Sequence, residues 1–456
     1  MAIDRSKLPP LGDLPPFQFP PIERRTLASG LRVWTVEHRA VPLTSVLILV
    51  RRGAAADPVG REGLAAMVGD LLDEGCGSLD ALALHEALGR IGAHLETEVG
   101  SDATLFGLTV LSRFAERGVA LMAEMLRDPR LDLRDFERVR DLRLNRLVQI
   151  RDMPPALADR AFTELVYGRH PYGHLAIGSE SGLRAIGLDG IKAFHAEAYA
   201  PSNVTVIAAG DAPHDSLAAL VENVLGDWPP GAATSGSDGG ALVEPPVPPT
   251  RLALLHKAGA AQSELRIGHM SVARNHPDYL ALLVLNMVLG GQFVSRLNMN
   301  LREDKGYTYG VRTAFEARRG PGPFLLQASV QSEATAEAIR ESIGEIAAIR
   351  GDRPVTREEL ETGRAALTRG YPRNFETAEQ VARAAAQMAL HDLPDDYYTT
   401  FVPRVLAIGE EEVTAMARRH LDPERLVTVV VGDRERVEPA LAPLALGDLL
   451  DLGVPA

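Results

Sequence analysis

The chain has little cysteine and no long apolar run, and both features exclude classes of protein. Cys76 is the only cysteine in 456 residues, so an intramolecular disulfide and a thiolate zinc site are both excluded. It lies in a Glu-Gly-Cys-Gly-Ser segment without a neighbouring base, and we interpret it as a turn residue rather than a nucleophile. The longest apolar run near the N-terminus, residues 46–50, has the length of a strand and not the ~20 residues of a membrane span.

An export signal and a basic charge are also missing from the sequence. Residues 1–21 are rich in proline and contain no apolar segment of the signal-peptide type, so we expect a cytoplasmic protein, with a periplasmic location as the alternative if a signal was removed. The chain has 48 basic and 61 acidic residues, a formal net charge of −13. This balance argues against a general nucleic-acid binder, whose affinity rests on neutralising phosphates. With 46% hydrophobic residues, the chain has enough apolar side chains for a sizeable core.

One segment with neither helix nor strand periodicity divides the chain into two parts of similar length. Gly, Ser and Pro dominate residues 229–250, which is the composition of a flexible linker. We therefore predict a Pro-rich tail at 1–21, a first half-domain at 22–228, this linker at 229–250, and a second half-domain at 251–456.

The two halves resemble each other, which indicates an internal duplication. Each half ends in a Pro turn, a β-branched strand and then Gly-Asp, and each contains an amphipathic helix and an alternating strand further upstream. These matching segments are 199–211 with 421–433, 133–140 with 355–364, and 103–110 with 322–330. A few strands beside long helices are typical of an α+β fold. We predict two tandem half-domains, each a mixed or antiparallel sheet with helices packed on one face.

The most specific pattern of residues lies early in the second half. A strongly apolar helix is predicted at 277–289 and ends at Gly290 and Gly291. A second helix follows and stops near Gly306, and the chain then alternates like a strand. Arg302 is therefore predicted in the last turn of a helix and Tyr309 on the strand that follows it.

This pattern closely resembles the second half of the pitrilysin/insulysin family of zinc peptidases, which includes small bacterial members and the mitochondrial processing peptidase. The family pattern is Gly-Gly, Ser-Arg-Leu, Leu-Arg-Glu, Gly and then Tyr. The sequence matches it at Gly290, Gly291, Ser295, Arg296, Leu297, Leu301, Arg302, Glu303, Gly306 and Tyr309. Tandem halves also fit the family, so the resemblance covers nearly the whole chain after the tail.

The first half departs from the family at the metal site. Active members carry His-x-x-Glu-His on a helix, in which both His bind zinc and the Glu activates water. Ala66 and Asp70 stand where the histidines would be, and Gly69 stands where the base would be. The family's further Glu ligand falls at or next to Arg146, and the neighbouring Asn145 is not acidic either. The resemblance therefore implies that this chain holds no metal and that zinc belongs to a partner subunit.

Other histidines offer no replacement for the lost zinc ligands. His85 and His94 are nine residues apart, and His170 and His174 share one loop. Neither pair has helical i, i+4 placement with an adjacent acid, so we interpret all four as structural.

The resemblance assigns roles to the residues that remain. Counterparts of Arg302 and Tyr309 bind the substrate carbonyl and the oxyanion that forms from it, and we predict them as catalytic. Arg296 is predicted to support the turn. A purely structural alternative places Arg302 as a helix C-terminal cap and Tyr309 against the sheet. Substrate-binding residues are predicted at Gly290, Gly291 and Ser295.

Two hypotheses of function follow. In the first, the chain is the zinc-free subunit of a heteromeric peptidase, and it supplies Arg302, Tyr309 and half of a peptide chamber to a homologous zinc-bearing subunit. In the second, it is a structural or peptide-binding homodimer without catalysis. Independent hydrolysis through an unrelated site is a third, weaker alternative. Substrate identity is not encoded in any pattern that we can interpret.

Overall fold

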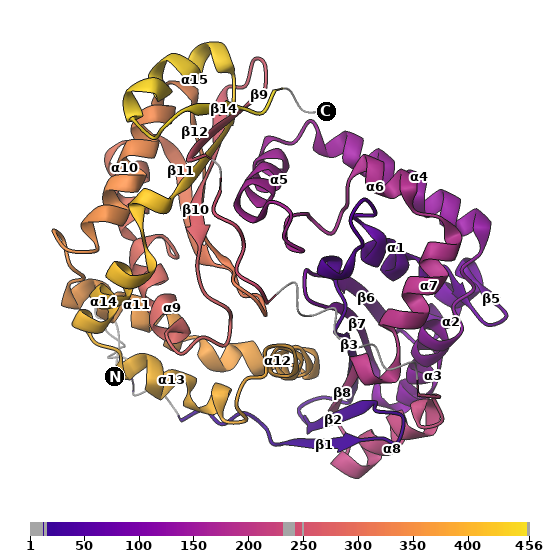
Figure 1. Cartoon of the computed structure of the whole chain (residues 1–456). Helices are drawn as coiled ribbons and strands as arrows, with labels where there is room; N and C mark the ends of the chain where they lie inside the picture. Colours follow the sequence, from indigo (N-terminus) through magenta and orange to yellow (C-terminus); the bar gives the residue numbers. More distant parts are fainter. Residues whose placement is uncertain (1–11, 13–15, 231–241, 249, 454–456) are drawn as a thin grey trace, which may run out of the picture.

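Two six-stranded mixed sheets form the framework of the computed structural model, which describes residues 12, 16–230, 242–248 and 250–453 (Figure 1). The first sheet contains, in spatial order, β1 (Ile22–Thr26), β2 (Arg32–Glu37), β8 (Val204–Gly210), β3 (Leu43–Val50), β7 (Thr104–Leu111) and β6 (His94–Val99). The second contains β11 (Thr308–Phe315), β12 (Pro323–Gln331), β10 (Gln262–Met270), β13 (Val427–Gly432), β9 (Leu252–His256) and β14 (Leu449–Asp451). A two-stranded ribbon, β4 (Gly75–Cys76) with β5 (Leu79–Asp80), holds the buried Cys76.

Five strands of each sheet share one order and one set of pairing directions, which supports the duplication inferred from the sequence. The sixth strand differs, because β1 pairs antiparallel with β2 whereas β14 pairs parallel with β9. In each, the strand that closes the half, β8 or β13, lies between an antiparallel neighbour and a parallel neighbour. These closing strands are buried along their whole length, and they read as continuous apolar runs because both of their faces are covered.

Helices cover the sheets on their outer faces. In the first half these are α1 (Leu64–Leu71), α2 (Ala81–Arg90), α3 (Ala115–Arg127), α4 (Leu133–Ile150), α6 (Glu180–Ala185), α7 (Leu188–Ala198) and α8 (His214–Leu225). In the second half they are α9 (Tyr279–Leu289), α10 (Thr335–Ala348), α11 (Arg357–Thr368), α13 (Tyr397–Ala407), α14 (Glu410–His420) and α15 (Arg434–Leu441). Helix α11 begins with a capping box in which Thr356 and Glu359 satisfy each other's backbone N–H groups.

The halves exchange one helix each, which the sequence did not predict. Helix α5 (Pro154–Tyr167) belongs to the first half in sequence but packs on β10 and β13 of the second sheet. Helix α12 (Ala378–His391) belongs to the second half but packs on β3 and β8 of the first (Figure 1). Each exchanged helix covers the sheet face opposite to the outer helices. The prediction of helices on one face thus describes the outer layer alone.

The described part of the N-terminal tail also joins the halves. Phe17 stacks on Phe375 with ring centroids 4.8 Å apart, and Phe19 is buried beside Tyr398. A second junction forms where the turn between β11 and β12 meets the first half, since Arg319 N and the Tyr172 hydroxyl both donate to Asp102. The halves therefore share packed and hydrogen-bonded contacts.

The α+β architecture of two similar halves is confirmed. All strands of the first sheet lie within 22–228, and all those of the second lie within 251–456. Residues 1–11, 13–15, 231–241 and 249, which make up much of the predicted tail and linker, lie outside the described residues. The domain boundaries themselves stay a prediction.

Candidate functional site

Helix α1 carries the positions at which the sequence lacks zinc ligands. Ala66 is 3% exposed and offers no donor atom. Gly69 faces β6 so closely that a Cβ built on it would lie 3.0 Å from Cγ2 of Val99. A side chain at position 69 would therefore require the Val99 side chain to shift.

An ion pair takes the place of metal ligation at Asp70. Nε of Arg143, on α4, donates to Oδ2 of Asp70 at 2.7 Å, and the Arg143 side chain is only 12% exposed. Arg146, which the alignment with the family singled out, is exposed and donates to Gln149 instead. Arg143 lies one turn earlier on the same helix face, and its role emerges only when α1 and α4 pack together.

A cavity of about 540 Å³ lies beside this ion pair. Its lining includes Asp70, Asp73, Glu74 and His85 together with apolar side chains of α2, α4 and β6. Burial raises the pKa of Asp73 to about 6, and the neighbouring Glu74 adds to the rise. His85 lies 3.9 Å from Asp73. Among the described residues, these groups do not form a set of three ligand atoms close enough to hold an ion. The residues of this half therefore do not fit zinc.

The other three histidines considered as replacement ligands, His94, His170 and His174, have polar partners within the fold. His94 pairs with Glu96 at 2.8 Å, and His174 pairs at 3.1 Å with the buried Asp57. Asp57 also accepts the backbone N–H groups of Gly63 and Ala65 at the start of α1. His170 accepts the Tyr172 backbone N–H, and burial lowers its pKa. These contacts agree with the structural interpretation.

Arg302 lies on a π-helical segment, η4 (Asn298–Asp304), rather than on a regular α-helix. Such segments are rare in proteins, and those that occur are often found at functional sites. The Arg302 guanidinium lies over the Phe293 ring, with Cζ 3.2 Å from the ring centroid. Its Nε donates to Oε1 of Glu303 at 2.9 Å, and the side chain is 12% exposed. In this conformation Arg302 is therefore held by its neighbours and partly neutralised.

Tyr309 lies on β11, the edge strand of the second sheet, and is 94% exposed. A register shift between Thr308 and Val311 places it in a bulge, where the strand pairing is interrupted. Thr308 stabilises the bulge by donating to Ser329 O at 2.6 Å. The structural alternative, in which Tyr309 packs on the sheet, does not agree with this exposure.

The predicted substrate-binding residues make close contacts within the segment. A Cβ on Gly290 would lie 2.6 Å from the Thr313 side chain, and one on Gly291 would lie 2.5 Å from Asn286 Nδ2. Ser295 is 1% exposed, and its hydroxyl accepts from Asn298 Nδ2 at 3.1 Å. These contacts explain the residue types by packing, and a role in binding substrate stays a prediction.

Asn298 joins the start of η4 to β11. Its amide donates to Val311 O at 2.8 Å and to Gln292 O at 3.0 Å, and its Oδ1 accepts Val311 N at 2.9 Å. The residue is 4% exposed. One buried amide thus fixes the Arg302-bearing segment relative to the Tyr309-bearing strand.

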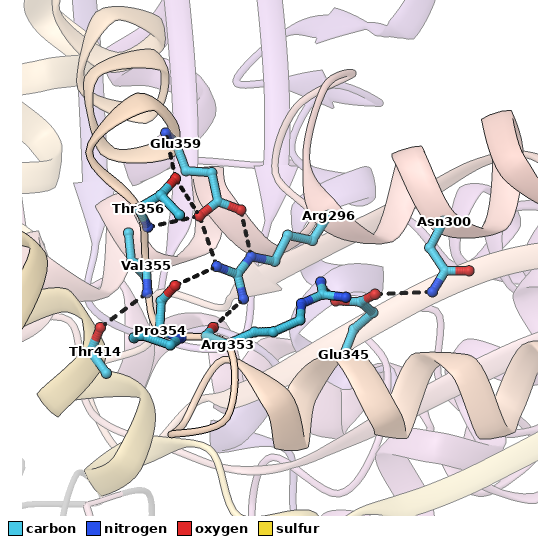
Figure 2. A network of polar contacts seen from close by, with 9 residues as sticks. All are labelled: Arg296, Asn300, Glu345, Arg353, Pro354, Val355, Thr356, Glu359 and Thr414. Carbon is cyan, nitrogen blue, oxygen red and sulfur yellow. Dashed lines mark hydrogen bonds and ion pairs between the residues drawn. The ribbon is translucent and has the colours of Figure 1, made fainter.

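Arg296 anchors the same segment to α11, as Figure 2 shows. Its Nε and Nη2 donate to the two oxygens of Glu359 at 2.6 and 2.7 Å, and its remaining donors reach Arg353 O and Pro354 O. Burial alone would raise the pKa of Glu359, but hydrogen bonds from Arg296 and Thr356 outweigh it and hold the pKa below its usual value. This network agrees with the interpretation that Arg296 supports the turn.

A second anchor holds the middle of η4 (Figure 2). Asn300 donates to Glu341 and Glu345 on α10, each at 2.9 Å. Glu345 also pairs with Arg353 at 2.6 Å, so the two anchors meet at one loop. The segment before and within η4 is therefore tied to α10, α11 and β11, and within it Arg302 is stacked on Phe293.

The chain is similar to known protein families and to bacterial proteins. Residues 32–178 match the family profile described as Insulinase (Peptidase family M16), and residues 185–367 match the one described as Peptidase M16 inactive domain. An uncharacterized zinc protease of Mycobacterium tuberculosis is 28% identical over 415 residues, 90% of this chain and 92% of that protein. The non-peptidase homolog YmxG of Helicobacter pylori is 21% identical over 408 residues, 88% and 91% of the two chains.

Solved structures give the same result for the fold. A crystal structure of a peptidase M16 inactive domain from Pseudomonas fluorescens superposes with a TM-score of 0.82 at 25% identity, covering 91% of this chain and 98% of that one. The duplicated topology, the Gly-Gly to Tyr pattern and these matches lead to one conclusion. The chain belongs to the insulinase family of peptidases.

Proposed function

We propose that this chain is the zinc-free subunit of a heteromeric insulinase-type metallopeptidase. A homologous partner would supply the zinc and the water-activating base. This chain would supply Arg302, Tyr309 and one side of the peptide chamber. The observation that carries the proposal is an asymmetry: the metal position is occupied by the Asp70–Arg143 pair, whereas the Arg302 segment is anchored on three sides.

The chemistry of Arg302 and Tyr309 fits the carbonyl of a peptide. A guanidinium is always charged and donates through several N–H groups, and a phenol donates without needing to titrate. Tyr309 is nearly fully exposed, so a ligand reaches its hydroxyl without rearrangement. Glu303 competes for Arg302, and we infer that a peptide carbonyl displaces it in part. A preorganised donor of this kind is worth about 2.7–4 kcal/mol once charge develops on the oxygen.

Co-expression with a zinc-bearing homologue tests the proposal. We expect peptide cleavage by the complex, and a loss of kcat of about 10²–10³-fold for Arg302→Ala and for Tyr309→Phe. Arg357→Ala is the matched control, because this arginine is 83% exposed on α11 and pairs only with Glu361 one turn away. Full activity of the double variant would overturn the roles of Arg302 and Tyr309.

A second candidate function is a non-catalytic homodimer that binds peptides or has a structural role. The pairing of Arg302 with Glu303 and Phe293 favours it, because a guanidinium that is already paired with a carboxylate and stacked on a ring is less available to a substrate carbonyl. The mass of the purified protein by light scattering separates the two. A stable dimer of identical chains, with no cleavage when a zinc-bearing homologue is added, supports this alternative and contradicts the first.

A further inference from the structure

Three potential metal ligands meet at the outer side of the second half, far along the chain from the lost zinc motif. His276 and Asp278 directly precede α9, and His420 is the last residue of α14. One ring nitrogen of each histidine and one carboxylate oxygen all lie within 4.8 Å of one another. We propose that His276, Asp278 and His420 bind one divalent first-row transition-metal ion, with Zn²⁺ as the representative case.

The donor set matches the ion class. Imidazole nitrogen and carboxylate oxygen are ordinary ligands of Zn²⁺, at about 2.0–2.2 Å from the metal. Two histidines and one carboxylate leave at least one coordination position for water. All three side chains are half-buried, so an ion would be partly shielded from solvent yet could enter without opening the core. Small side-chain rotations suffice to bring atoms within 4.8 Å onto one ion.

The present hydrogen bonds hold these ligands beside one another. Nε2 of His420 lies 2.7 Å from Oδ2 of Asp278, and the two imidazole rings are in an edge-on arrangement with centroids 5.6 Å apart. Nδ1 of His276 accepts the backbone N–H of Asp278 at 3.1 Å. Burial would raise the pKa of Asp278, but the hydrogen bonds from His420 and Arg419 outweigh it and lower that pKa. The carboxylate is therefore presented in its charged form.

Binding exchanges these contacts for metal coordination. Nε2 of His420 gives up its proton to solvent as the ring takes one at Nδ1, so a neutral ring remains with its lone pair on the ion. Nδ1 of His276 already carries its lone pair, because it accepts the Asp278 backbone N–H, so this nitrogen binds the ion without losing a proton once that contact is released. Because only unprotonated nitrogens coordinate, affinity falls as the solution is acidified.

Arg419 competes with a metal ion for the Asp278 carboxylate. Its Nη1 donates to the same Oδ2 of Asp278 at 2.8 Å, which places a positive charge next to the proposed ion. The Arg419 side chain is 62% exposed, so it can swing into solvent when an ion arrives. A second cation so close raises the free energy of the bound state, and removal of Arg419 should therefore tighten metal binding.

The site would connect two packed helices. Helices α9 and α14 contact each other, and α9 leads directly to Gly290 and the segment that carries Arg302. An ion here would stabilise the second half without taking part in catalysis. This inference does not depend on the proposed peptidase role.

Calorimetric titration of the untagged, chelator-treated full chain with ZnCl₂ tests the proposal, with thermal unfolding as a second readout. We expect one Zn²⁺ per chain and a rise of several degrees in Tm. His276→Ala and His420→Gln should each weaken binding at least tenfold, and Arg419→Gln should tighten it several-fold. Arg418→Gln is the matched control, because Arg418 donates to Arg350 O and not to Asp278. His85→Ala controls for an exposed surface histidine.

Two results would overturn the site. One is binding that is equally strong in both histidine variants, which would place the ion elsewhere. The other is no uptake of one Zn²⁺ per chain by wild type and by Arg419→Gln, both of which keep all three ligands. Circular dichroism of each variant shows whether it is folded, and Arg419→Gln removes an exposed side chain, so folding does not limit the second test.

Discussion

Nε of Arg143 on α4 donates to Oδ2 of Asp70 on α1 at 2.7 Å, at the position where active relatives of the chain would hold a metal. The pair is a direct contact between helices α1 and α4. Arg143 is largely buried and Asp70 is less so. Removal of Asp70 therefore leaves a largely buried guanidinium without its charged partner, whereas removal of Arg143 leaves a carboxylate that is more exposed to water.

Asp70→Ala should lower the free energy of unfolding by about 1–3 kcal/mol, because a buried charged donor loses its acceptor. Urea unfolding followed by circular dichroism measures this. Asp215→Ala is the control, because Asp215 pairs with Arg25 but is 91% exposed, and exposed pairs are worth about 0–1 kcal/mol. Equal effects of the two substitutions would contradict a special role for the Asp70–Arg143 pair.

Arg296→Ala should lower the free energy of unfolding by about 3–5 kcal/mol, since it leaves the Glu359 carboxylate without its bidentate partner. Arg296→Lys should recover little of this loss, because an ammonium does not reproduce the guanidinium fork. Chemical denaturation of both variants checks the prediction. A lysine variant as stable as wild type would show that charge alone, and not the fork, anchors the segment.

Phe162→Ala should lower the free energy of unfolding by about 3–5 kcal/mol through the cavity it leaves. Phe162 lies on the exchanged helix α5 and is 2% exposed, and its Cζ would lie 3.0 Å from a Cβ on Gly268 of the second sheet. Hydrogen exchange should show faster exchange in β10 and β13. Phe293→Ala, at a ring that is 69% exposed, serves as the control, and protection lost only in the first half would contradict the exchanged packing.

His391 makes stability depend on pH. Burial lowers the pKa of His391 to about 4, with nearby arginines including Arg274 adding to the effect. Between pH 6.5 and 4 the unfolded chain binds a proton at His391 and the folded chain does not. The contribution of His391 to the free energy of unfolding is therefore fully present above pH 6.5 and is lost as the pH falls towards 4. The loss amounts to roughly 3 kcal/mol.

His391→Leu should therefore show a smaller drop in stability between pH 7 and pH 4 than wild type does. Unfolding free energies measured at several pH values test this. His94→Leu is the control, because His94 is 69% exposed at its side chain. An acid limb with the same slope in wild type and in His391→Leu would contradict the prediction.

Short-range patterns in the sequence were enough to predict one helix and one strand of the candidate site. The apolar helix before Gly290 and the strand that carries Tyr309 follow from periodicity, because 3.6-residue and two-residue repeats report burial locally. The same reasoning expected a regular helix around Arg302, and the structure has the π-helical segment η4. Asn298, Asn300 and Glu359 were not singled out, since polar residues at such spacing carry no signal until the elements that they join are packed.

The sequence by itself determined that the chain is duplicated, that it is α+β, and that Ala66 and Gly69 cannot ligate a metal, because periodicity and the chemistry of a side chain are local properties. Only the tertiary structure decided which helices cover which sheet, that Arg143 reaches Asp70, and that His276, Asp278 and His420 meet. His276 and His420 are 144 positions apart (420 − 276), and α12 begins 328 positions after the end of β3 (378 − 50). Such proximity arises from packing between elements that no local pattern encodes.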